Sequence, residues 1–517
     1  MAETSSTDQP WLGDACSLVD AFRSGDRSPR EELEATLAAI ESSDLNAFSH
    51  IDPERARRAA DEADVNKPFG GVPFAIKELD EVEGWPDTGA SLVFKDRKAT
   101  HTSWAIERVL GDGGAVPVGL TTASEFGGLN VSVTKLNGVT HNPWQHGRTA
   151  GGSSGGAATA VAGGLVSLAS GGDGGGSIRI PAGYTGLLGF KGTYGRISRG
   201  PRAPFRPGTV VPGNLARSVR DAARYFDVAA GVDPRDPTSL PSHGHWEADL
   251  GTNDLKGRRF AVVPALGGVT LETGVEENLR RWADDLAAAT GMVQVEHDLQ
   301  TPNLAAMWMM GNLSTLLPEL GDRWPSCAKD LTDEVALGVY LSQALYNLES
   351  AAVAEAQRLE LHEAMASAFE EVDFIVASTN PGPAFKAESS KSADVDIMDK
   401  VLGNAAARLG LRGALTGVSM VSGAFHKLPR KLVETMEAKF PELVAMGGLT
   451  IASNVYGNPA VSIPAGLVNG LPVGAQVLAP HHRDGLLFDV ALAAEQSMPW
   501  PQVAPSVTGA GEVIPTR

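Results

Sequence analysis

Short apolar runs alternate with glycine-rich turns between residues 70 and 200, and this pattern constrains the fold more than any other feature. Residues 72–76 (VPFAI) and 165–169 (LVSLA) each begin directly after a pair of glycines. Apolar runs of this length are typical of strands buried inside a sheet. Residues 104–112 and 157–162 lie between such runs and are predicted to be helices. The alternation predicts an α/β fold built on one large sheet.

The segments on either side of this region have different patterns. The first seventy residues are predicted to be helical, and residues 28–31 (SPRE) form a capping box with proline at the first helical position. Residues 300–445 are rich in Met, Leu and Trp and are predicted to be mostly helical, with one strand at 374–377. Strand patterns return at residues 460–463 and 473–477. The C-terminal part is therefore expected to rejoin the core.

The charge and the cysteine content argue against several classes of protein. The 517 residues include 62 acidic and 43 basic side chains, which gives a formal net charge of −19. An acidic surface repels phosphate backbones and anionic lipids, so neither nucleic acid nor a membrane is an expected partner. Cys16 and Cys327 are the only cysteines, and the sequence does not start with a basic and apolar leader. We therefore expect a cytoplasmic protein without a disulfide framework.

Two glycine–serine segments stand out, at residues 151–156 (GGSSGG) and 174–179 (GGGSIR). Glycine lets the backbone bend sharply and approach a ligand closely, and it leaves N–H groups free to point at a negative oxygen. Three glycines that run into Ser177 can place backbone donors and a hydroxyl around one point. Acyl transfer needs this arrangement.

Other interpretations of these segments remain open at this point. A single Gly-Ser run is more often a flexible turn with solvated serines. A phosphate-binding loop requires a lysine directly before the serine or threonine, and neither segment has one. Residues 151–155 also fit G-x-S-x-G, the nucleophile elbow of α/β-hydrolases, which would make Ser153 the nucleophile. That elbow follows a buried strand, which residues 141–148 are not predicted to form.

A serine nucleophile needs a base beside it. The histidines at 243 and 245 fall in a predicted surface loop, and those at 481 and 482 fall in a polar turn. No histidine has a zinc-binding spacing, and we expect neither a metal nor a cofactor. Lys77 ends the first apolar run, where a strand would carry it into the core and burial would lower its pKa. Taken alone, such a lysine is more often the solvated end of a strand.

Five segments share the pattern of one known family. They are residues 71–78 (GVPFAIKE), 151–156 (GGSSGG), 173–181 (DGGGSIRIP), 191–196 (KGTYGR) and 462–474 (SIPAGLVNGLPVG). Together they resemble the amidase signature family, whose pattern also requires the separation of 24 positions between Ser153 and Ser177. The resemblance implies an α/β fold with a large mixed β-sheet core flanked by helices on both faces.

The resemblance also implies how the chain is organised. We expect an N-terminal helical segment packed on the core at residues 1–68, the core with the signature at 69–300, a variable and mostly helical segment that covers the core and forms the substrate pocket at 301–445, a C-terminal return to the sheet at 446–505 and a tail at 506–517.

Carried over from the family, three residues form a catalytic triad. Ser177 is implied to be the nucleophile, which forms an acyl-enzyme with the substrate. Ser153, in a cis conformation, is implied to relay the proton between Ser177 and Lys77. Lys77, neutral at rest, is implied to be the general base.

The resemblance further implies an oxyanion hole and a set of supporting residues. The hole is built from the backbone N–H groups of Gly174, Gly175, Gly176 and Ser177, and the supporting residues are Ser154, Asp173 and Arg179. The chain departs from the family at Gly172 and Gly174, where threonines are usual. Because glycine has more conformational freedom to lose, these two departures are expected to loosen the loop.

The resulting prediction is an amidase that hydrolyses a small-molecule carboxylic amide, with an aryl or aliphatic amide, ester or carbamate as the preferred class. Residues 307–310, 411–420 and 455–456 are candidates for an apolar pocket. One alternative is the glutaminase subunit of a tRNA-dependent amidotransferase, and another is a non-catalytic ligand-binding relative. A homodimer is left open.

Overall fold

A mixed sheet of eleven strands forms the centre of the described part of the chain. The computed structural model describes residues 8–202, 208–242, 244–302, 304–390 and 441–508. In their order across the sheet, the strands are β1 (Phe48–Ile51), β3 (Val116–Thr121), β2 (Pro73–Lys77), β8 (Leu168–Asp173), β10 (Val211–Ala216), β9 (Leu188–Lys191), β14 (Ala460–Val468), β15 (Leu471–Leu478), β13 (Phe374–Ser378), β11 (Arg259–Val262) and β12 (Val293–Gln294). Strand β2 pairs in parallel with β3 and β8, and β11 pairs in parallel with β12 and β13. The remaining pairs are antiparallel.

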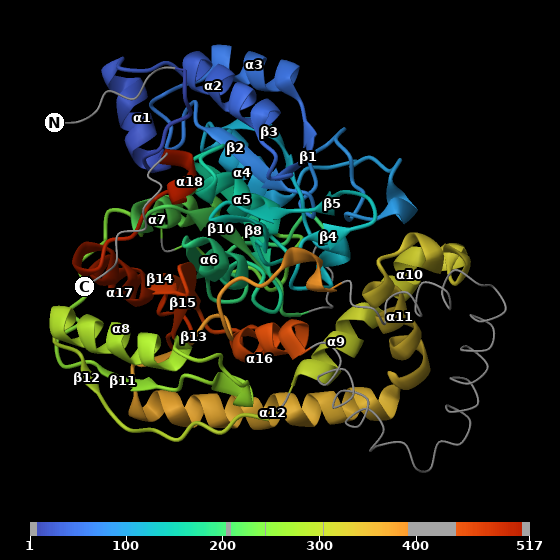
Figure 1. The fold of residues 1–517 in the computed structure, drawn as a ribbon, viewed down its shortest axis with the longest axis vertical. Coiled ribbons are helices and arrows are strands. Elements are labelled where there is room, and N and C mark those ends of the chain that lie inside the picture. Colours follow the sequence, from blue (N-terminus) through green and yellow to red (C-terminus); the bar gives the residue numbers. More distant parts are fainter. Residues whose placement is uncertain (1–7, 203–207, 243, 303, 391–440, 509–517) are drawn as a thin grey trace.

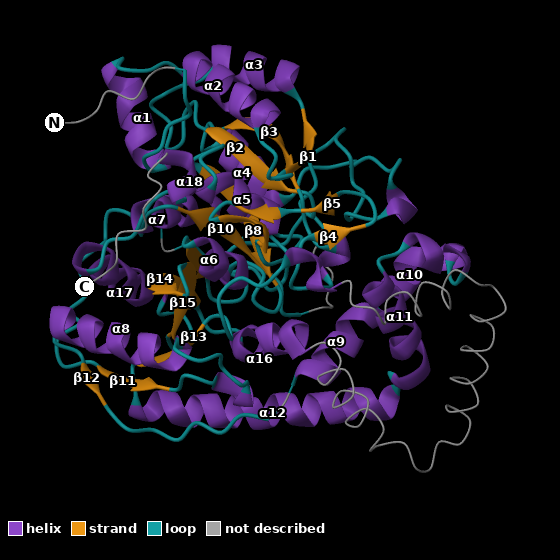
Figure 2. Ribbon diagram, in the orientation of Figure 1, coloured by secondary structure: helices purple, strands orange, loops and turns teal. Residues whose placement is uncertain are grey.

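Helices cover both faces of this sheet, because successive side chains of each strand point to opposite faces (Figures 1 and 2). In β2, Phe74 and Ile76 pack into one apolar cluster, whereas Ala75 packs into another. The first face is covered by α1 (Ala15–Ser24), α4 (Trp104–Gly111), α7 (Val219–Ala229), α8 (Val275–Thr290) and α17 (Asp484–Ser497). The opposite face is covered by α5 (Gly155–Ala162), α6 (Arg179–Thr185), α12 (Leu348–Glu371) and α16 (Pro441–Tyr456). The predicted mixed α/β architecture is confirmed.

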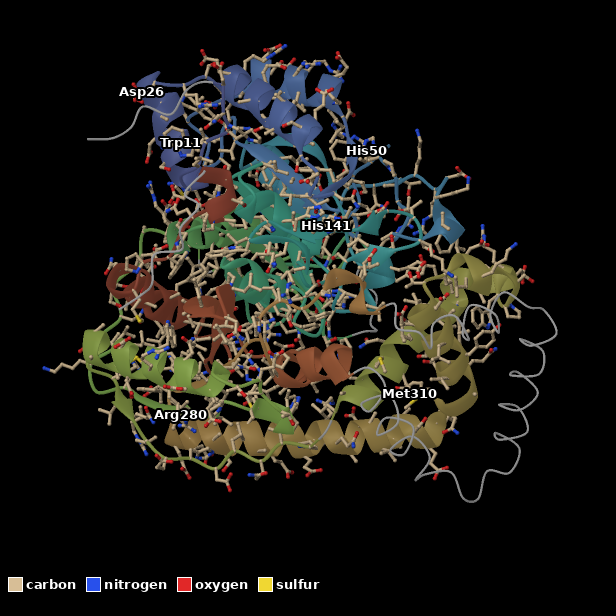
Figure 3. The ribbon with its side chains drawn as sticks, viewed as in Figure 1. Trp11, Asp26, His50, His141, Arg280 and Met310 are labelled. Atoms are coloured by element: carbon tan, nitrogen blue, oxygen red, sulfur yellow. The ribbon has the colours of Figure 1, made fainter. Side chains whose placement is uncertain are left out.

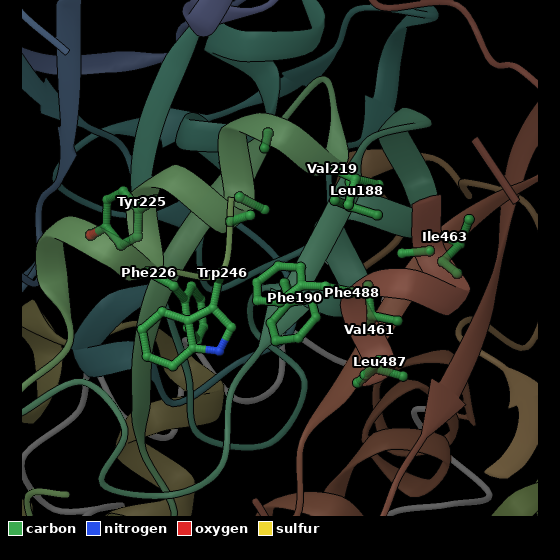
Figure 4. Close-up of a cluster of buried hydrophobic side chains, with 14 of the residues drawn as sticks. Leu188, Phe190, Val219, Tyr225, Phe226, Trp246, Val461, Ile463, Leu487 and Phe488 are labelled. Atoms are coloured by element: carbon green, nitrogen blue, oxygen red, sulfur yellow. The ribbon is translucent and has the colours of Figure 1, made fainter. Parts of the chain in front are cut away.

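Stacked aromatic rings fill the centre of the first face (Figure 4). Phe190 of β9 stacks on Phe488 of α17 with ring centroids 3.8 Å apart, and Phe226 of α7 meets the Phe190 ring edge-on at 5.1 Å. Trp246 closes the cluster against Phe226. Aromatic pairs contribute about 0.5–1.5 kcal/mol each beyond the area they bury. The cluster therefore fastens two helices to the middle of the sheet.

Two further groups of helices lie at the periphery. The N-terminal pair is α2 (Pro29–Ser42) and α3 (Pro53–Asp61), and the covering group is α9 (Ala305–Ser314), α10 (Leu316–Leu320) and α11 (Asp333–Leu345), with the short α18 (Pro505–Thr508) near the end of the chain. The predicted capping box is present at the start of α2. Asp26 and Arg280 are exposed, whereas Met310 of α9 is buried; all three are labelled in Figure 3.

The structure differs from the sequence prediction in the first seventy residues and at β8. Strand β1 interrupts the N-terminal helices and pairs antiparallel with β3. Strand β8 begins later than the predicted run at 165–169, because Leu165 N donates back to Ala160 O at the end of α5. Its C-terminal half contains Gly171 and Gly172, which remain in the strand because β10 pairs with both. As a result, β8 reaches as far as the site described below.

The segment before Ser153 is a small exposed hairpin. Strands β6 (His141–Asn142) and β7 (Gln145–Thr149) pair with each other outside the main sheet, and most of β7 is exposed. Ser153 therefore does not follow a buried strand, and the elbow interpretation has no support from the backbone.

Cys16 and Cys327 are buried free thiols. Within the described ranges, no helix combines the length and the apolar character that crossing a membrane requires.

Candidate active site

Lys77 ends β2 in the middle of the sheet. All five residues of β2 are buried, because β3 and β8 flank the strand and helices cover both of its faces. The Lys77 Nζ lies 2.7 Å from Ser153 Oγ and donates to Gly172 O at 3.2 Å. Burial lowers the pKa of Lys77 from its ordinary 10.5 to about 8, although the carboxylates of Asp80 and Asp173 oppose the shift. The prediction that the strand carries this lysine into the core is confirmed.

Ser153 is preceded by a cis peptide bond to Gly152, as the family resemblance implies. The next residue links the two glycine–serine segments, because Ser154 N donates to the carbonyl oxygen of Ser177 at 3.3 Å. A side chain at Gly152 would lie 2.7 Å from the backbone nitrogen of Val131. Close packing of backbone on backbone therefore requires glycine at that position.

Ser177, Ser153 and Lys77 all line one cavity of about 260 Å³. Ser177 is only 5% exposed and lies just before α6. The residues around the three are Leu79, Asp80, Phe126, Gly127, Gly128, Gly172, Gly174, Gly175, Thr209, Val210, Trp308, Met309, Asn312, Leu313, Thr315 and Leu316. The fold thus brings the three predicted catalytic residues, which come from separate parts of the chain, to a single cavity.

The loop from Asp173 to Ser177 contains the predicted oxyanion donors. Gly176 N donates to the Asp173 carboxylate at 2.7 Å. This N–H is therefore engaged within the protein, and its place in the oxyanion hole stays a prediction. The N–H groups of Gly174, Gly175 and Ser177 make no hydrogen bond with the described part of the chain. These three donors remain available to a ligand in the cavity.

A fully buried ion pair, Asp173 with Arg179, holds this loop from behind. Arg179 Nε donates to one oxygen of Asp173 and Nη2 to the other, both at 3.0 Å. Burial alone would raise the pKa of Asp173, but the Arg179 guanidinium holds that pKa well below its usual range. Removing one partner of such a pair would leave a buried charge uncompensated. The predicted supporting role of both residues is thus consistent with their placement.

Helix α16 supplies two contacts that sequence reasoning missed. Thr450 Oγ1 donates to Gly175 O at 2.6 Å, and Asn454 Nδ2 donates to the Asp173 carboxylate at 2.9 Å. Gly176 has a φ of +122°, and a side chain there would meet Thr450 Oγ1 at 2.2 Å. Thr450 and Asn454 are four residues apart on one helix face, and this spacing was the available signal. Nothing in the sequence indicates which loop the two side chains contact.

The departures at Gly172 and Gly174 affect the loop unequally. Gly172 is a paired residue of β8, and its carbonyl accepts from Lys77. A side chain at Gly172 would have only Lys77 Nζ nearby, at 3.9 Å, whereas one at Gly174 would meet Val210 at 3.1 Å.

The predicted apolar pocket is only partly present in the cavity lining. Trp308 and Met309 line the cavity, whereas Met310 and Tyr456 do not. Residues 411–420 lie outside the described residues, as does the histidine at 243. His481 and His482 also lie away from the cavity, and His481 Nε2 donates to Tyr456 O at 2.7 Å. Among the described residues, no group of three or more His, Cys, Asp or Glu side chains is placed to hold a metal ion.

The chain is similar to several known proteins. The model of the Amidase family matches residues 31–409. A glutamyl-tRNA(Gln) amidotransferase subunit from Salinispora arenicola is 30% identical over 94% of this chain and 97% of its own length. The structure of 6-aminohexanoate cyclic dimer hydrolase is 26% identical, with a TM-score of 0.79 over 96% of this chain and 99% of that one. A bacterial aryl acylamidase shares the fold, with 24% identity and a TM-score of 0.81 over 97% of this chain and 99% of its own.

The family match extends over well more than half of the chain, and the relatives cover almost all of it. The chain therefore belongs to the Amidase family, the amidase signature enzymes, and is an enzyme that hydrolyses amide C–N bonds.

Proposed function

We propose that the enzyme hydrolyses a carboxamide through an acyl-enzyme on Ser177, with Ser153 as proton relay and Lys77 as general base. The observation that carries the proposal is the 2.7 Å contact between Lys77 Nζ and Ser153 Oγ in the cavity that Ser177 also lines. The lowered pKa of Lys77 leaves part of this amine neutral near pH 7, as a base requires.

In the first half-reaction, Ser177 Oγ attacks the amide carbon while its proton passes through Ser153 to Lys77. The carbonyl oxygen becomes an oxyanion, and the N–H groups of Gly174, Gly175 and Ser177 donate to it in this proposal. The C–N bond then breaks, and the leaving nitrogen takes the proton back from Lys77 through Ser153. In the second half-reaction, water attacks the ester while its proton passes through Ser153 to Lys77. The acid is released, and the proton returns to Ser177 Oγ.

Two classes of substrate are considered for this site, and the similar proteins support the first of them, glutamine. The relative from Salinispora arenicola is one component of an amidotransferase, and it matches this chain over nearly its full length. This match supports a glutaminase subunit, the alternative that the sequence left open, over a self-contained amidase. In that role the enzyme would release ammonia from glutamine within a complex of several subunits.

A specific feature of the cavity favours the second class, an uncharged amide with an apolar group. Phe126, Trp308, Met309, Leu313 and Leu316 contribute large apolar side chains to the described walls. Among the described lining residues, Lys77 is the only cation, and the mechanism uses it as a base. The α-carboxylate of glutamine would need a further cationic partner at this end of the cavity.

The nucleophile is tested by labelling with a fluorophosphonate probe and peptide mass mapping. We expect one adduct, on Ser177, because this hydroxyl has both a relay and free N–H donors beside it. An adduct on Ser153 would restore the elbow interpretation, and active enzyme that takes no label would exclude a serine mechanism.

The substrate class is tested with two adjacent methionines of α9. Met309 lines the cavity, whereas Met310 is buried beside it and does not. For an apolar substrate, Met309→Ala is expected to lower kcat/KM for a long aliphatic or aryl amide, relative to acetamide, by about tenfold, since a few lost methylene contacts are worth about 1–3 kcal/mol. Met310→Ala is the matched control and should leave this ratio unchanged.

Glutamine is assayed in parallel, with the chain alone and with candidate partner subunits. Ammonia release from glutamine that appears only with the partners, together with an unchanged ratio in Met309→Ala, would establish the glutaminase class. Size-exclusion chromatography of the same mixtures distinguishes a mixed complex from a homodimer.

A further inference from the structure

Asp80 is a carboxyl group in the catalytic cavity to which the proposed mechanism gives no role. It lies three residues after Lys77 and lines the same cavity. Its backbone nitrogen donates to Lys77 O at 2.8 Å, so the chain turns directly behind the base. This tight turn places a second ionisable side chain next to the amine that the reaction requires.

Ser170 of β8 connects this carboxyl group to the backbone of Lys77. Lys77 N donates to Ser170 Oγ at 2.8 Å, and Ser170 Oγ donates to Asp80 Oδ2 at 2.7 Å. A hydroxyl has a single proton, and here that proton is directed to Asp80 because the other contact is a donor. The carboxylate form of Asp80 is therefore stabilised by a hydrogen bond from a buried strand.

Asp80 lies near Lys77 but forms no direct ion pair with it in the described part of the chain. The described contacts of Lys77 Nζ are to Ser153 and Gly172, and Lys77 and Asp80 form no ion pair within 4.0 Å in the described part of the chain. A direct ion pair would hold the amine in its ammonium form and remove it as a base. At the greater distance, a carboxylate still favours the ammonium form through an interior of low dielectric constant.

The other charged and titratable groups around the pair are already engaged or neutral. Asp173, on β8, is paired with Arg179 of α6. Glu81 accepts a hydrogen bond from Ser103. Tyr225 of α7, labelled in Figure 4, has a pKa raised by burial and by Asp80, so it is uncharged at neutral pH. Among the described groups that face Lys77, Asp80 is thus the carboxylate without a cationic partner.

We propose that Asp80 is a positioning residue that sets the pH at which Lys77 becomes a base. Its carboxylate stabilises the ammonium form of Lys77, so the pair retains one proton over a range in which Lys77 alone would have lost it. The inference rests on the proposed role of Lys77 as the general base. It goes beyond that role because it assigns the control of the base to a residue outside the triad.

The direction of the pKa changes supports this arrangement. Burial raises the pKa of Asp80, and burial lowers that of Lys77, so the two values approach each other. Such a pair titrates as a unit rather than as two independent groups. Loss of the Asp80 charge removes the attraction that keeps Lys77 protonated, so neutral Lys77 should form at lower pH.

The test is the pH dependence of the rate at which a fluorophosphonate labels Ser177, which requires no knowledge of the substrate. Asp80→Asn keeps an acceptor for Ser170 but removes the charge. We expect the rising limb of the labelling rate to move to lower pH by about 1 unit or more, the size of effect that a nearby opposite charge produces. Glu83→Gln removes the same charge from an exposed position on the same loop and should leave the limb unchanged.

Two further variants keep the test decisive if Asp80→Asn does not fold. Asp80→Glu retains the charge and should keep the limb near its wild-type position. Ser170→Ala removes the hydrogen bond that favours the carboxylate, and it should move the limb in the same direction as Asp80→Asn by a smaller amount. The inference is overturned if the limb stays in place in the folded Asp80→Asn and Ser170→Ala variants. It is also overturned if the limb moves equally in Glu83→Gln.

The outcomes also separate this inference from the proposed function. Wild-type enzyme that is not labelled at Ser177, or whose labelling rate does not change when Lys77 is replaced, contradicts the proposed triad. Wild-type enzyme that is labelled at Ser177 with a Lys77-dependent limb, together with an Asp80→Asn variant that has the same limb, contradicts only the role of Asp80.

Discussion

Replacing Ser177 with alanine is expected to reduce amide hydrolysis by on the order of 10⁵-fold or more, because the variant lacks the oxygen that forms the acyl-enzyme. The loss should appear in kcat, while binding of the intact substrate changes little. The Ser177 hydroxyl makes no hydrogen bond with the described part of the chain, and the residue is 5% exposed. Its removal should therefore change the free energy of unfolding by less than about 1 kcal/mol.

The measurement combines initial rates, probe labelling and chemical denaturation on the same preparations. Ser153→Ala is the companion variant, since it removes the relay but leaves the nucleophile. We expect Ser153→Ala to retain slow labelling at Ser177, whereas Ser177→Ala takes no label. The opposite result, with label retained in Ser177→Ala and lost in Ser153→Ala, would assign the nucleophile to Ser153.

Replacing Lys77 with methionine is expected to lower kcat/KM at neutral pH by about 10³-fold, within the range that general-base catalysis contributes. Methionine fills a similar volume and introduces no charge into the buried end of β2. Ser177 and its N–H donors remain in place, so a residual rate above that in water should persist. Lys77→Arg should not restore activity, because a guanidinium does not lose its proton.

The pH dependence of the rate shows whether Lys77 acts in its neutral form. Only neutral Lys77 accepts a proton, and its pKa is lowered by burial to about 8, so the wild-type rate should rise as the pH passes through that region. In Lys77→Met this limb should disappear, and the residual rate should follow hydroxide concentration. A Lys77→Met enzyme with the wild-type profile would show that another group is the base.

The strands that determine the position of the site were predictable to different degrees. Strand β2 was recognised because five consecutive buried residues leave a clear apolar run after two glycines. Strand β8 was predicted too early in the chain, because its last residues are glycines and Asp173, which carry no strand signal of their own. Their strand conformation comes from pairing with β10, a contact between distant parts of the chain.

The proposed catalytic residues and three of their supports could be predicted because their spacing along the chain follows a family pattern, but the contacts from distant elements could not. Thr450 and Asn454 lie more than 270 positions after the loop they hold. Ser170 meets Lys77 and Asp80 only because β8 pairs with β2. The hydrogen bond from Gly176 N–H to Asp173 could not be predicted, because it depends on how the loop turns.

The sequence by itself thus determined the mixed α/β class, the strand that ends at Lys77 and the choice of Ser153 and Ser177 as candidate site residues. These features depend on local apolar runs, on glycine and on short motifs, all of which are readable along one stretch of chain. Only the tertiary structure decided which N–H groups stay free for an oxyanion and which carboxylate faces the base. Those properties depend on contacts between strands and helices far apart in the sequence, where burial and hydrogen bonding set the charge of Lys77.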